Sequence, residues 1–292
     1  MSNYQYGKDI LKDVLFRGGE KDDLIAGSTD YLEAAKKYIM RSYYDMISEY
    51  PFPSSLSNPP GIINTVGKVT GTATCTKGSA GVTFGAVISP SMTGMKFYVD
   101  GSGIRYRIAS HTSGANTAIL DATYKEDTTT GAFTAYQDEY ALAADCIALW
   151  KAADRSNSGE KIAIISMNEM DDVRGYVGTE GTRVSAISII QGGLIRVIPW
   201  TASSKTIEYV YTKRPPTLTW DGVASTDTPA IDEEHRHFLA DFALFLLLEN
   251  KRDERAKGIN SLAISQFASM KLQSAGEQRP RWYVKRGQGI WR

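Results

Sequence analysis

The sequence predicts an α+β protein: a helical body built from N-terminal helices and a C-terminal helical hairpin, with a mixed or antiparallel β meander and an inserted, small, all-β module resembling a sandwich or barrel. Three observations predict this class. Apolar residues recur at steps of three and four near both ends of the chain. Residues 64–138 hold 14 Thr, 6 Ser and 10 Gly and carry apolar residues in short alternating runs. Further short runs, separated by Gly or Ser pairs, follow this span.

Residues 1–63 form the predicted N-terminal helical segment of the body. A short amphipathic helix is expected from Ile10 to Phe16, closed by a glycine pair, and a second helix of about twenty residues is expected to start near Asp30. Asp30 and Glu33 have the spacing of a capping box. The second helix would bury one stripe, made of Leu32, Ala35, Ile39, Tyr43, Met46, Ile47 and Tyr50. Four prolines between residues 51 and 60 then indicate a linker or a tight crossover.

Residues 64–138 are predicted to be an inserted β module. Its expected strands are Val69–Cys75, Val82–Phe84, Met95–Val99, Ile104–Ala109, Ala118–Leu120 and Phe133–Tyr136. Turns are expected at Lys77-Gly78-Ser79, Asp100-Gly101 and Ser113-Gly114. No helical pattern interrupts the span, so it would form a sheet structure of its own.

Residues 139–278 complete the predicted body. An ordered stretch is expected at Asp145–Trp150, a strand at Lys161–Ile165, a short helix at Glu169–Tyr176, and a meander of Val184–Ile190, Leu194–Pro199 and Ile207–Thr212. Two helices, Asp232–Asn250 and Gly258–Ser274, follow and are separated by the charged run Lys251-Arg252-Asp253-Glu254-Arg255. A helical hairpin is the simplest arrangement of this pair.

The last segment, residues 279–292, is predicted to be an extended docking tail. It carries five basic residues, no acidic residue and two of the five tryptophans. Such a segment could stack on nucleic acid, bind a membrane surface, dock into a partner protein or fold back on its own domain. Docking is favoured, since five charges are few for a nucleic-acid arm and no amphipathic helix is present. The predicted docking residues are Arg279, Arg281, Trp282, Tyr283, Lys285, Arg286, Ile290, Trp291 and Arg292.

Composition excludes several classes of protein. Lysine plus arginine and aspartate plus glutamate both total 33, which argues against a globally basic nucleic-acid coat. Without the tail the balance is 28 basic against 33 acidic residues, so the body is mildly acidic. Residues 1–9 lack the apolar stretch of a secretory signal, and the apolar run Phe238–Leu248 is about half the ~20 residues of a membrane span. We expect a soluble, non-exported protein with no membrane partner.

No residue pattern predicts catalysis, and we expect neither enzymatic activity nor a cofactor or metal. His235 and His237 would lie on different faces of a helix, and His111 stands apart from both. The glycines of residues 175–181 lack the preceding strand and the Lys-Ser/Thr pair of a phosphate loop. Cys75 and Cys146 are expected to be small buried residues.

Two stretches carry a resemblance to a known family. Tyr136–Asp145 reads Tyr-Gln-Asp-Glu-Tyr-Ala-Leu-Ala-Ala-Asp and resembles the return from the β insertion in the head-to-tail adaptors of tailed bacteriophages, with Ala143 where proline is usual. Arg214–Trp220, followed by Asp227–His235, is similar to the passage into the C-terminal helices of these adaptors, with Asp232 where proline often starts the helix.

The resemblance implies a ring, commonly of twelve copies, that lies beneath the portal and extends the DNA channel. It implies these partners: further copies of the chain, the portal protein, tail or neck (nozzle) proteins, and packaged DNA in transient, non-specific contact. The C-terminal tail would insert into the portal, and the β module is expected to project outward. The location implied is the virion neck, and the host cytoplasm during assembly.

Two alternatives stay open. In the second hypothesis, the chain is a baseplate or fibre component whose β module binds a receptor or glycan, and it assembles with trimeric or sixfold symmetry. An enzyme with an unrecognised site is the third hypothesis.

Overall fold

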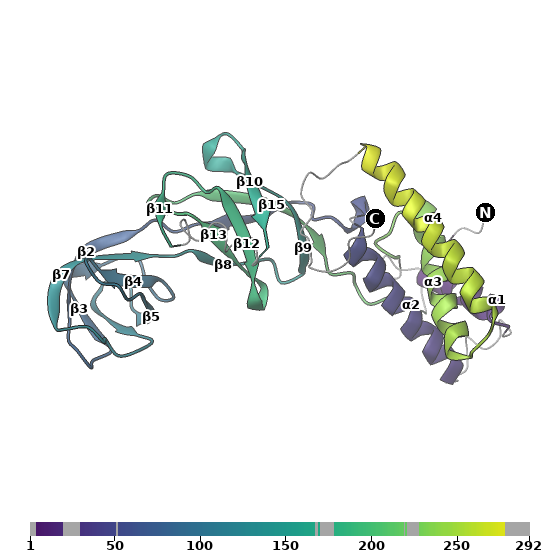
Figure 1. Cartoon of the computed structure of the whole chain (residues 1–292), viewed down its shortest axis with the longest axis horizontal. Helices are drawn as coiled ribbons and strands as arrows, with labels where there is room; N and C mark the ends of the chain where they lie inside the picture. The colour runs from purple at the N-terminus through teal and green to yellow at the C-terminus, as the bar shows by residue number, and fades with distance from the viewer. Residues whose placement is uncertain are drawn as a thin grey trace. The chain divides into compact units, whose positions relative to one another are not determined.

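The computed structural model describes residues 4–19, 30–50, 52–166, 169, 178–218, 220 and 228–277, and for residues 191 and 272–277 it describes the backbone alone. Over these residues the chain is a mixed α+β protein (Figure 1). The α-helices are α1 (Gly7–Arg17), α2 (Asp30–Glu49), α3 (Arg236–Asn250) and α4 (Arg255–Glu277). Turns of 3-10 helix are η2 (Pro53–Ser55), η3 (Arg155–Asn157), η6 (Gln191–Gly193) and η8 (Glu233–His235). The strands are β1 (Gly61–Asn64), β2 (Val69–Cys75), β3 (Gly81–Ile88), β4 (Lys96–Val99), β5 (Tyr106–His111), β6 (Ala115–Leu120), β7 (Thr129–Tyr136), β8 (Glu139–Ala141), β9 (Cys146–Asp154), β10 (Glu160–Ile165), β11 (Glu180–Gly181), β12 (Ala186–Ile190), β13 (Leu194–Ile198), β14 (Trp200–Thr201) and β15 (Thr206–Lys213).

The chain divides into two compact units. The helical unit comprises Met1–Pro59, Asp145–Trp150 and Val210–Arg281. The described residues of the strand unit belong to Pro60–Ala144 and Lys151–Tyr209.

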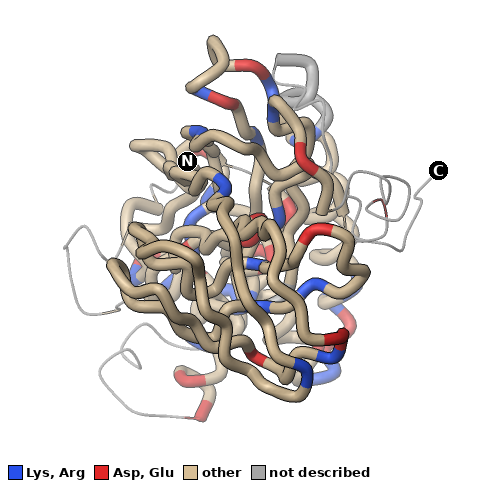
Figure 2. The backbone as a smooth tube through the Cα atoms, turned by 90° about the vertical axis from the view of Figure 1, so that its left-hand side faces the viewer, with Lys and Arg blue, Asp and Glu red and all other residues tan. Residues whose placement is uncertain are grey.

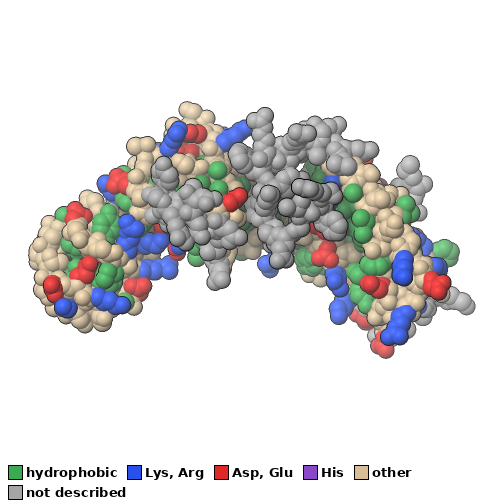
Figure 3. Space-filling model, viewed as in Figure 1, with side chains coloured by type: hydrophobic (Ala, Val, Ile, Leu, Met, Phe, Trp, Pro, Cys, Tyr) green, Lys and Arg blue, Asp and Glu red, His purple; other side chains and the backbone are tan. Residues whose placement is uncertain are grey.

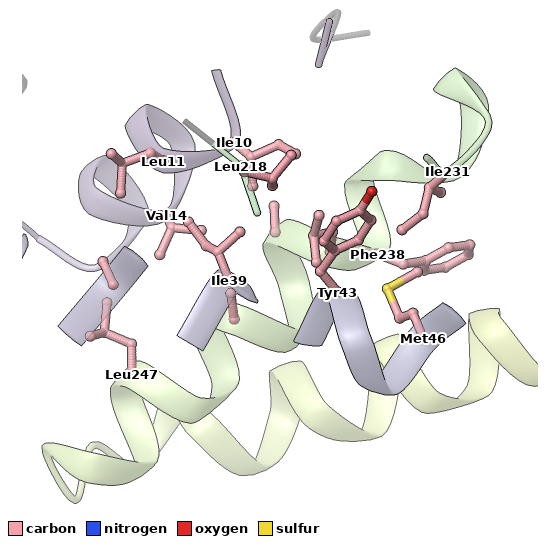
Figure 4. Close-up of a cluster of buried hydrophobic side chains, with 14 of the residues drawn as sticks. Ile10, Leu11, Val14, Ile39, Tyr43, Met46, Leu218, Ile231, Phe238 and Leu247 are labelled. Carbon is pink, nitrogen blue, oxygen red and sulfur yellow. The ribbon is translucent and has the colours of Figure 1, made fainter. Parts of the chain in front are cut away.

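The helical unit is held together by apolar stripes that meet around α3. α2 buries residues spaced three and four apart, as its sequence predicts, and Ile39 and Tyr43 of this stripe are fully buried. α1 buries one side through Ile10, Leu11 and neighbouring aliphatic residues. Figure 4 shows these side chains converging on α3, whose sequence is apolar on nearly all sides because three other helices pack against it. In this view α1 and α4 lie on opposite sides of α3.

α3 and α4 contact each other through aromatic rings. The rings of Phe238 and Phe267 lie 5.6 Å apart, centroid to centroid, and those of Phe242 and Phe267 lie 5.8 Å apart, both edge to face. Such edge-to-face pairs stabilise a contact beyond the area that they bury.

The strand unit contains a seven-stranded sheet in the order β1-β15-β9-β10-β12-β13-β8. β1 with β15, β9 with β10, β12 with β13 and β13 with β8 run antiparallel, whereas β10 and β12 run parallel. The meander expected from the sequence is confirmed only for its first two strands, since β12 and β13 pair directly from Ala186↔Ile198 to Ile190↔Leu194. Its expected third strand, Ile207–Thr212, is wrong as a neighbour of β13, because β15 lies between β1 and β9.

The strand unit also contains a closed barrel of six strands, in the order β2-β3-β6-β5-β4-β7. Its core is aromatic: the ring of Phe133 lies 4.9 Å from that of Phe84 and 5.5 Å from that of Phe97. Glycines at two expected turns, Gly101 and Gly114, have φ of +86° and +85°, a conformation that other residues adopt at a cost. The sandwich-or-barrel expectation thus resolves to a barrel, within residues 69–136.

Several sequence expectations are confirmed and some need correction. α2 begins at Asp30 and has 20 residues, and β2 has the expected bounds. Cys75 is fully buried, whereas Cys146 is only half-buried, which corrects the expectation for that residue. The helix expected at 169–176 lies outside the described residues except for position 169. No helix in the described part of the chain is long and apolar enough to cross a membrane.

Candidate functional site

The predicted docking residues, Arg279, Arg281, Trp282, Tyr283, Lys285, Arg286, Ile290, Trp291 and Arg292, all lie outside the described residues. Three features of the described chain supply the remaining candidates. They are the segment that leads out of the barrel, a buried arginine in the helical unit, and the exposed surfaces of both units.

The segment that leads out of the barrel is fastened by Tyr140. Its hydroxyl accepts a hydrogen bond from the backbone N–H of Val66 (3.0 Å) and donates one to the carbonyl of Gln137 (2.9 Å). Val66 precedes the first barrel strand and Gln137 follows the last one, so a single side chain ties the incoming chain to the outgoing chain. Burial raises the pKa of Tyr140 to about 12, so the hydroxyl stays protonated and able to donate.

A charged cluster, which we call the neck cluster, surrounds the same segment. It consists of Lys96, Asp138, Glu139 and Arg196. Lys96 Nζ lies 2.7 Å from Asp138 Oδ2, and Arg196 Nη2 lies 2.5 Å from Glu139 Oε1. Asp138 is 1% exposed, and these cations are its charged neighbours in the buried site. Because Lys96 belongs to the barrel and Arg196 to the sheet, the cluster fixes the barrel on the sheet.

Opposing effects set the pKa of Glu139. Burial alone would raise it, but the hydrogen bond from Arg196 and the charge of Lys96 outweigh burial, and the pKa lies below its ordinary value of 4.5. The carboxylate is therefore the stable form in the folded protein. Glu139 therefore acts as an anchor for Arg196 and Lys96 rather than as a proton donor.

Two stacked rings lie beside the neck cluster. The rings of Tyr136 and Trp200 are 4.5 Å apart and nearly parallel, at 15°. Both side chains are almost completely buried, and burial raises the pKa of Tyr136 to about 12. The stack joins the last barrel strand to β14 and adds apolar area to a contact that is otherwise ionic.

The positions that depart from the adaptor pattern have their own hydrogen bonds. The backbone N–H of Ala143 donates to the hydroxyl of Tyr209 (2.9 Å), a bond that a proline at this position lacks the hydrogen to make. Two residues later, Asp145 Oδ1 accepts from the hydroxyl of Tyr211 (2.9 Å). Asp232 has φ of −58°, which is the value that a proline ring imposes.

The buried arginine is Arg236, at the start of α3. Its guanidinium donates to the carbonyls of Tyr4 (2.9 Å), Gln5 (3.1 Å) and Ile231 (2.9 Å). It is 9% exposed, and burial lowers its pKa. The side chain therefore fastens the start of the chain to the C-terminal helices, across more than two hundred residues.

Exposed surfaces differ between the two units. On the barrel, four threonines in register cross neighbouring strands and all are exposed: Thr130, Thr74, Thr83 and Thr117. We call this set the threonine row. The Oγ1 atoms of Thr74 and Thr130 lie 2.9 Å apart. In the view of Figure 2 the strands nearest the reader are tan for most of their length, with charges gathered mainly toward their ends.

In the helical unit, α3 and α4 border a hollow of about 370 Å³. Its lining contains no Asp, Glu, Lys or Arg and consists of His235, His237, Phe238, Ser265, Gln266, Ser269 and Met270. The two histidines, which the sequence placed on different faces, both reach this hollow because His235 lies in η8 and His237 in the first turn of α3. The hollow holds no charged nucleophile or carboxylate pair. Among the described residues no group of three or more His, Cys, Asp or Glu side chains could hold a metal ion.

The comparisons with known proteins agree with the resemblance. A family model described as SU10 adaptor protein matches residues 107–288, which is more than half of the chain. The matched range begins in β5 and takes in the neck cluster's acids, the sheet, α3 and α4. No curated protein matches the chain significantly. The chain belongs to the SU10 adaptor protein family, which confirms the predicted membership of the bacteriophage head-to-tail adaptors.

Proposed function

We propose that this adaptor forms a ring, commonly of twelve copies, beneath the portal, where it extends the DNA channel and links the capsid portal to the tail. The observation that carries the proposal is the family match across residues 107–288. In keeping with it, the described residues build binding and anchoring contacts rather than an arrangement of catalytic groups. The proposed role is structural, in the virion neck after assembly in the host cytoplasm.

The proposed ring body consists of the helices, with residues 1–63 and 139–278 as its two parts and α3 with α4 as a helical hairpin. The contacts of Phe238 and Phe242 with Phe267 support that hairpin. Residues 64–138 are proposed as an inserted module that meets tail or neck proteins. Arg236 supports this division into body and module. It links Tyr4 and Gln5, near the N-terminus, to the start of α3, and no barrel residue takes part in these hydrogen bonds.

Residues 279–292 are proposed as the segment that inserts into the portal. Trp282, Tyr283, Trp291 and the five basic residues are of the types that dominate binding energy at protein interfaces. The body without this segment has five more acidic than basic residues. This balance suits transient contact with passing DNA, because like charges repel the phosphate backbone.

Truncation tests portal docking. We expect a chain that ends at residue 278 to keep its helical circular dichroism and to lose binding to purified portal protein. A full-length variant with Trp282→Ala and Trp291→Ala tests the contribution of the two tryptophans to portal binding while the five basic residues are kept. Ser274→Ala, just before the tail, is the matched control. Undiminished portal binding by the truncated chain contradicts the docking role.

Imaging tests the ring. Negative-stain images and native mass of the protein, alone and with portal, are expected to show a closed ring with about twelve copies, as the family resemblance implies. Trimers or sixfold rings would instead favour a baseplate or fibre component.

The threonine row favours that second candidate, because a flat face of hydroxyl groups offers hydrogen bonds to a receptor or glycan. Binding of the protein to host cells, lost in Thr74→Ala with Thr83→Ala, would support it.

A further inference from the structure

Few large apolar side chains of the helical unit face solvent. Among its described residues they are Phe16 on α1 (71% exposed), Tyr44 on α2 (38%) and Leu262 and Ile264 on α4 (57% and 53%). Green side chains are visible over this unit in Figure 3. The most exposed of them belong to α1 and α4, the two helices that lie on opposite sides of α3 (Figure 4). Phe16 is the most exposed of these side chains, so nearly the whole ring is accessible to a partner.

Phe16 ends a basic stripe on the outer side of α1. Lys8, Lys12 and Phe16 are four residues apart, so they share one face of the helix. The buried residues Leu11 and Leu15 lie on the other side. Lys12 is exposed and, within the described chain, makes no ion pair. The stripe therefore offers an aromatic side chain preceded, one turn away, by a free cation.

The hollow between α3 and α4 has the complementary properties. Phe238 and His237 form an aromatic wall, with ring centroids 4.0 Å apart, and Met270 adds a flexible thioether that adapts to aromatic rings. Glu233 and Glu234 lie just before its two histidines, and both are exposed; the Glu234 side chain is 78% exposed. The α4 wall continues through residues 258–270, where no charged residue occurs. The depletion of charge at the centre of a contact is typical of protein interfaces.

We infer that Phe16 of one copy inserts into the hollow of a neighbouring copy, with Lys12 placed against Glu233 and Glu234 of that neighbour. A volume of about 370 Å³ has room for a phenylalanine ring. The basic stripe on one side and the acidic residues on the other give the pair its charge complementarity and its orientation. The inference rests on the proposed ring and names the surfaces that would build it.

The occupant is a second copy rather than the same one. Arg17, the residue after Phe16, is held by Asp13 (3.0 Å) and by Asp241 of α3 (2.7 Å). These ion pairs fix the end of α1 against α3, on the side away from α4. A contact between two different patches is heterologous, and repetition of such a contact closes into a ring or continues as a filament. The two patches belong to different helices of one unit, so each copy can offer one patch to each of two neighbours.

Disulfide trapping tests the contact in the full-length protein. Phe16→Cys combined with Ser269→Cys is expected to give, on mild oxidation, a ladder of cross-linked species that extends beyond the dimer. Each single variant should give no ladder, which also controls for Cys75 and Cys146. Tyr44→Cys with Ser269→Cys is the matched control at another exposed aromatic position. A ladder from the control pair that equals the test pair would overturn the inference.

Substitution measures the strength of the contact. Phe16→Ala is expected to raise the concentration for half-assembly roughly 30-fold, the loss typical of a hot-spot residue, whereas Tyr44→Ala should leave it unchanged. Lys12→Glu and Glu234→Lys should each weaken assembly, and their combination should restore it.

The outcomes separate the two proposals. If the wild type assembles but Phe16→Ala assembles equally well and the cysteine pair gives no ladder, the named contact is wrong and the ring stands. If the wild type stays monomeric with and without portal, the ring fails, and the contact with it.

Discussion

The barrel and the helical unit both enclose an apolar core, but they gather it from very different lengths of chain. Every fully buried residue of the barrel core lies between Ala73 and Ala135. The core of the helical unit combines residues from 10–52 with residues from 218–270. A core made of one continuous segment can form once short loops have closed. The helical core forms only after the two distant parts of the chain have come together, which costs more loop-closure entropy. The barrel is thus the more self-sufficient of the two regions.

The two cores also differ in chemistry. The barrel packs aromatic rings of Phe84, Phe97 and Phe133 in a small closed volume. The helical unit combines mainly aliphatic stripes with the aromatic contacts of Phe238 and Phe267, and it also holds one buried cation, Arg236. Loss of one ring should therefore harm the barrel alone, and loss of the cation should harm the helical unit alone.

The largest expected effect is that of Phe133→Ala. Its side chain is 1% exposed and contacts two other rings, so its loss should destabilise the barrel by about 3–5 kcal/mol. Labelling of Cys75 reports the change, because this thiol is buried and burial raises its pKa to about 11. We expect fast labelling in the variant and slow labelling in the wild type, with helical circular dichroism unchanged. Equal loss of helical signal would show that the two cores unfold as one.

Arg236→Met is expected to have the next largest effect. It leaves three backbone carbonyls without their charged donor, at a cost of about 2–3 kcal/mol. Limited proteolysis should then cut near Tyr4 and Gln5 while Cys75 stays protected. His237→Gln, one residue away and exposed to the hollow, is the matched control. Resistance to protease like that of the wild type would contradict the fastening role of Arg236.

A smaller effect should appear on acidification. Because the folded protein holds the pKa of Glu139 below 4.5, this carboxylate contributes full stability above that value and loses it as pH falls through the folded pKa. Glu139→Gln should therefore cost stability near neutral pH and show less further loss in acid. Urea unfolding of the strand unit, above and below pH 4.5, measures this. An identical acid loss in both proteins would exclude Glu139 as the cause.

The smallest effect is expected on the threonine row. Thr74→Ala removes an exposed hydrogen bond to Thr130, and surface changes of this kind stay within about 0.5 kcal/mol. Urea unfolding followed by Cys75 labelling checks this. A loss that approached that of Phe133→Ala would mean that the row supports the barrel rather than a partner.

Local pattern predicted much of the fold. The stripe of α2 and the alternation of β2 are properties of neighbouring residues, and both elements have the expected bounds. The strand order of the barrel could not be predicted from the sequence. β2 and β7 pair across some sixty residues, and the alternation of apolar and polar residues along a strand does not indicate which strand pairs with it.

The functional contacts were harder to predict. Arg236 stands between two histidines in a sequence that predicts a polar helix start, and two of its three partner carbonyls, those of Tyr4 and Gln5, are more than 230 residues away. The neck cluster joins Lys96 to Asp138 and Arg196 to Glu139, pairs that no spacing rule connects. Phe16 was expected only as the last residue of a short helix; its exposure depends on how α1 packs. The docking role of residues 279–292 stays a prediction.

The two hydrogen bonds of the Tyr140 hydroxyl, which tie the chain entering the barrel to the chain leaving it, have a mechanical consequence. Val69 pairs with Ala135, so the chain enters and leaves the barrel side by side at one end. Tension applied along the backbone would first meet the bond between Val66 and Tyr140, and then the Val69↔Ala135 pair, before it reached any core residue. The neck cluster and the stack of Tyr136 on Trp200 join the barrel to the sheet at the same end. In the proposed ring, tension between head and tail would therefore load these contacts at the base of the barrel before it strained the barrel core.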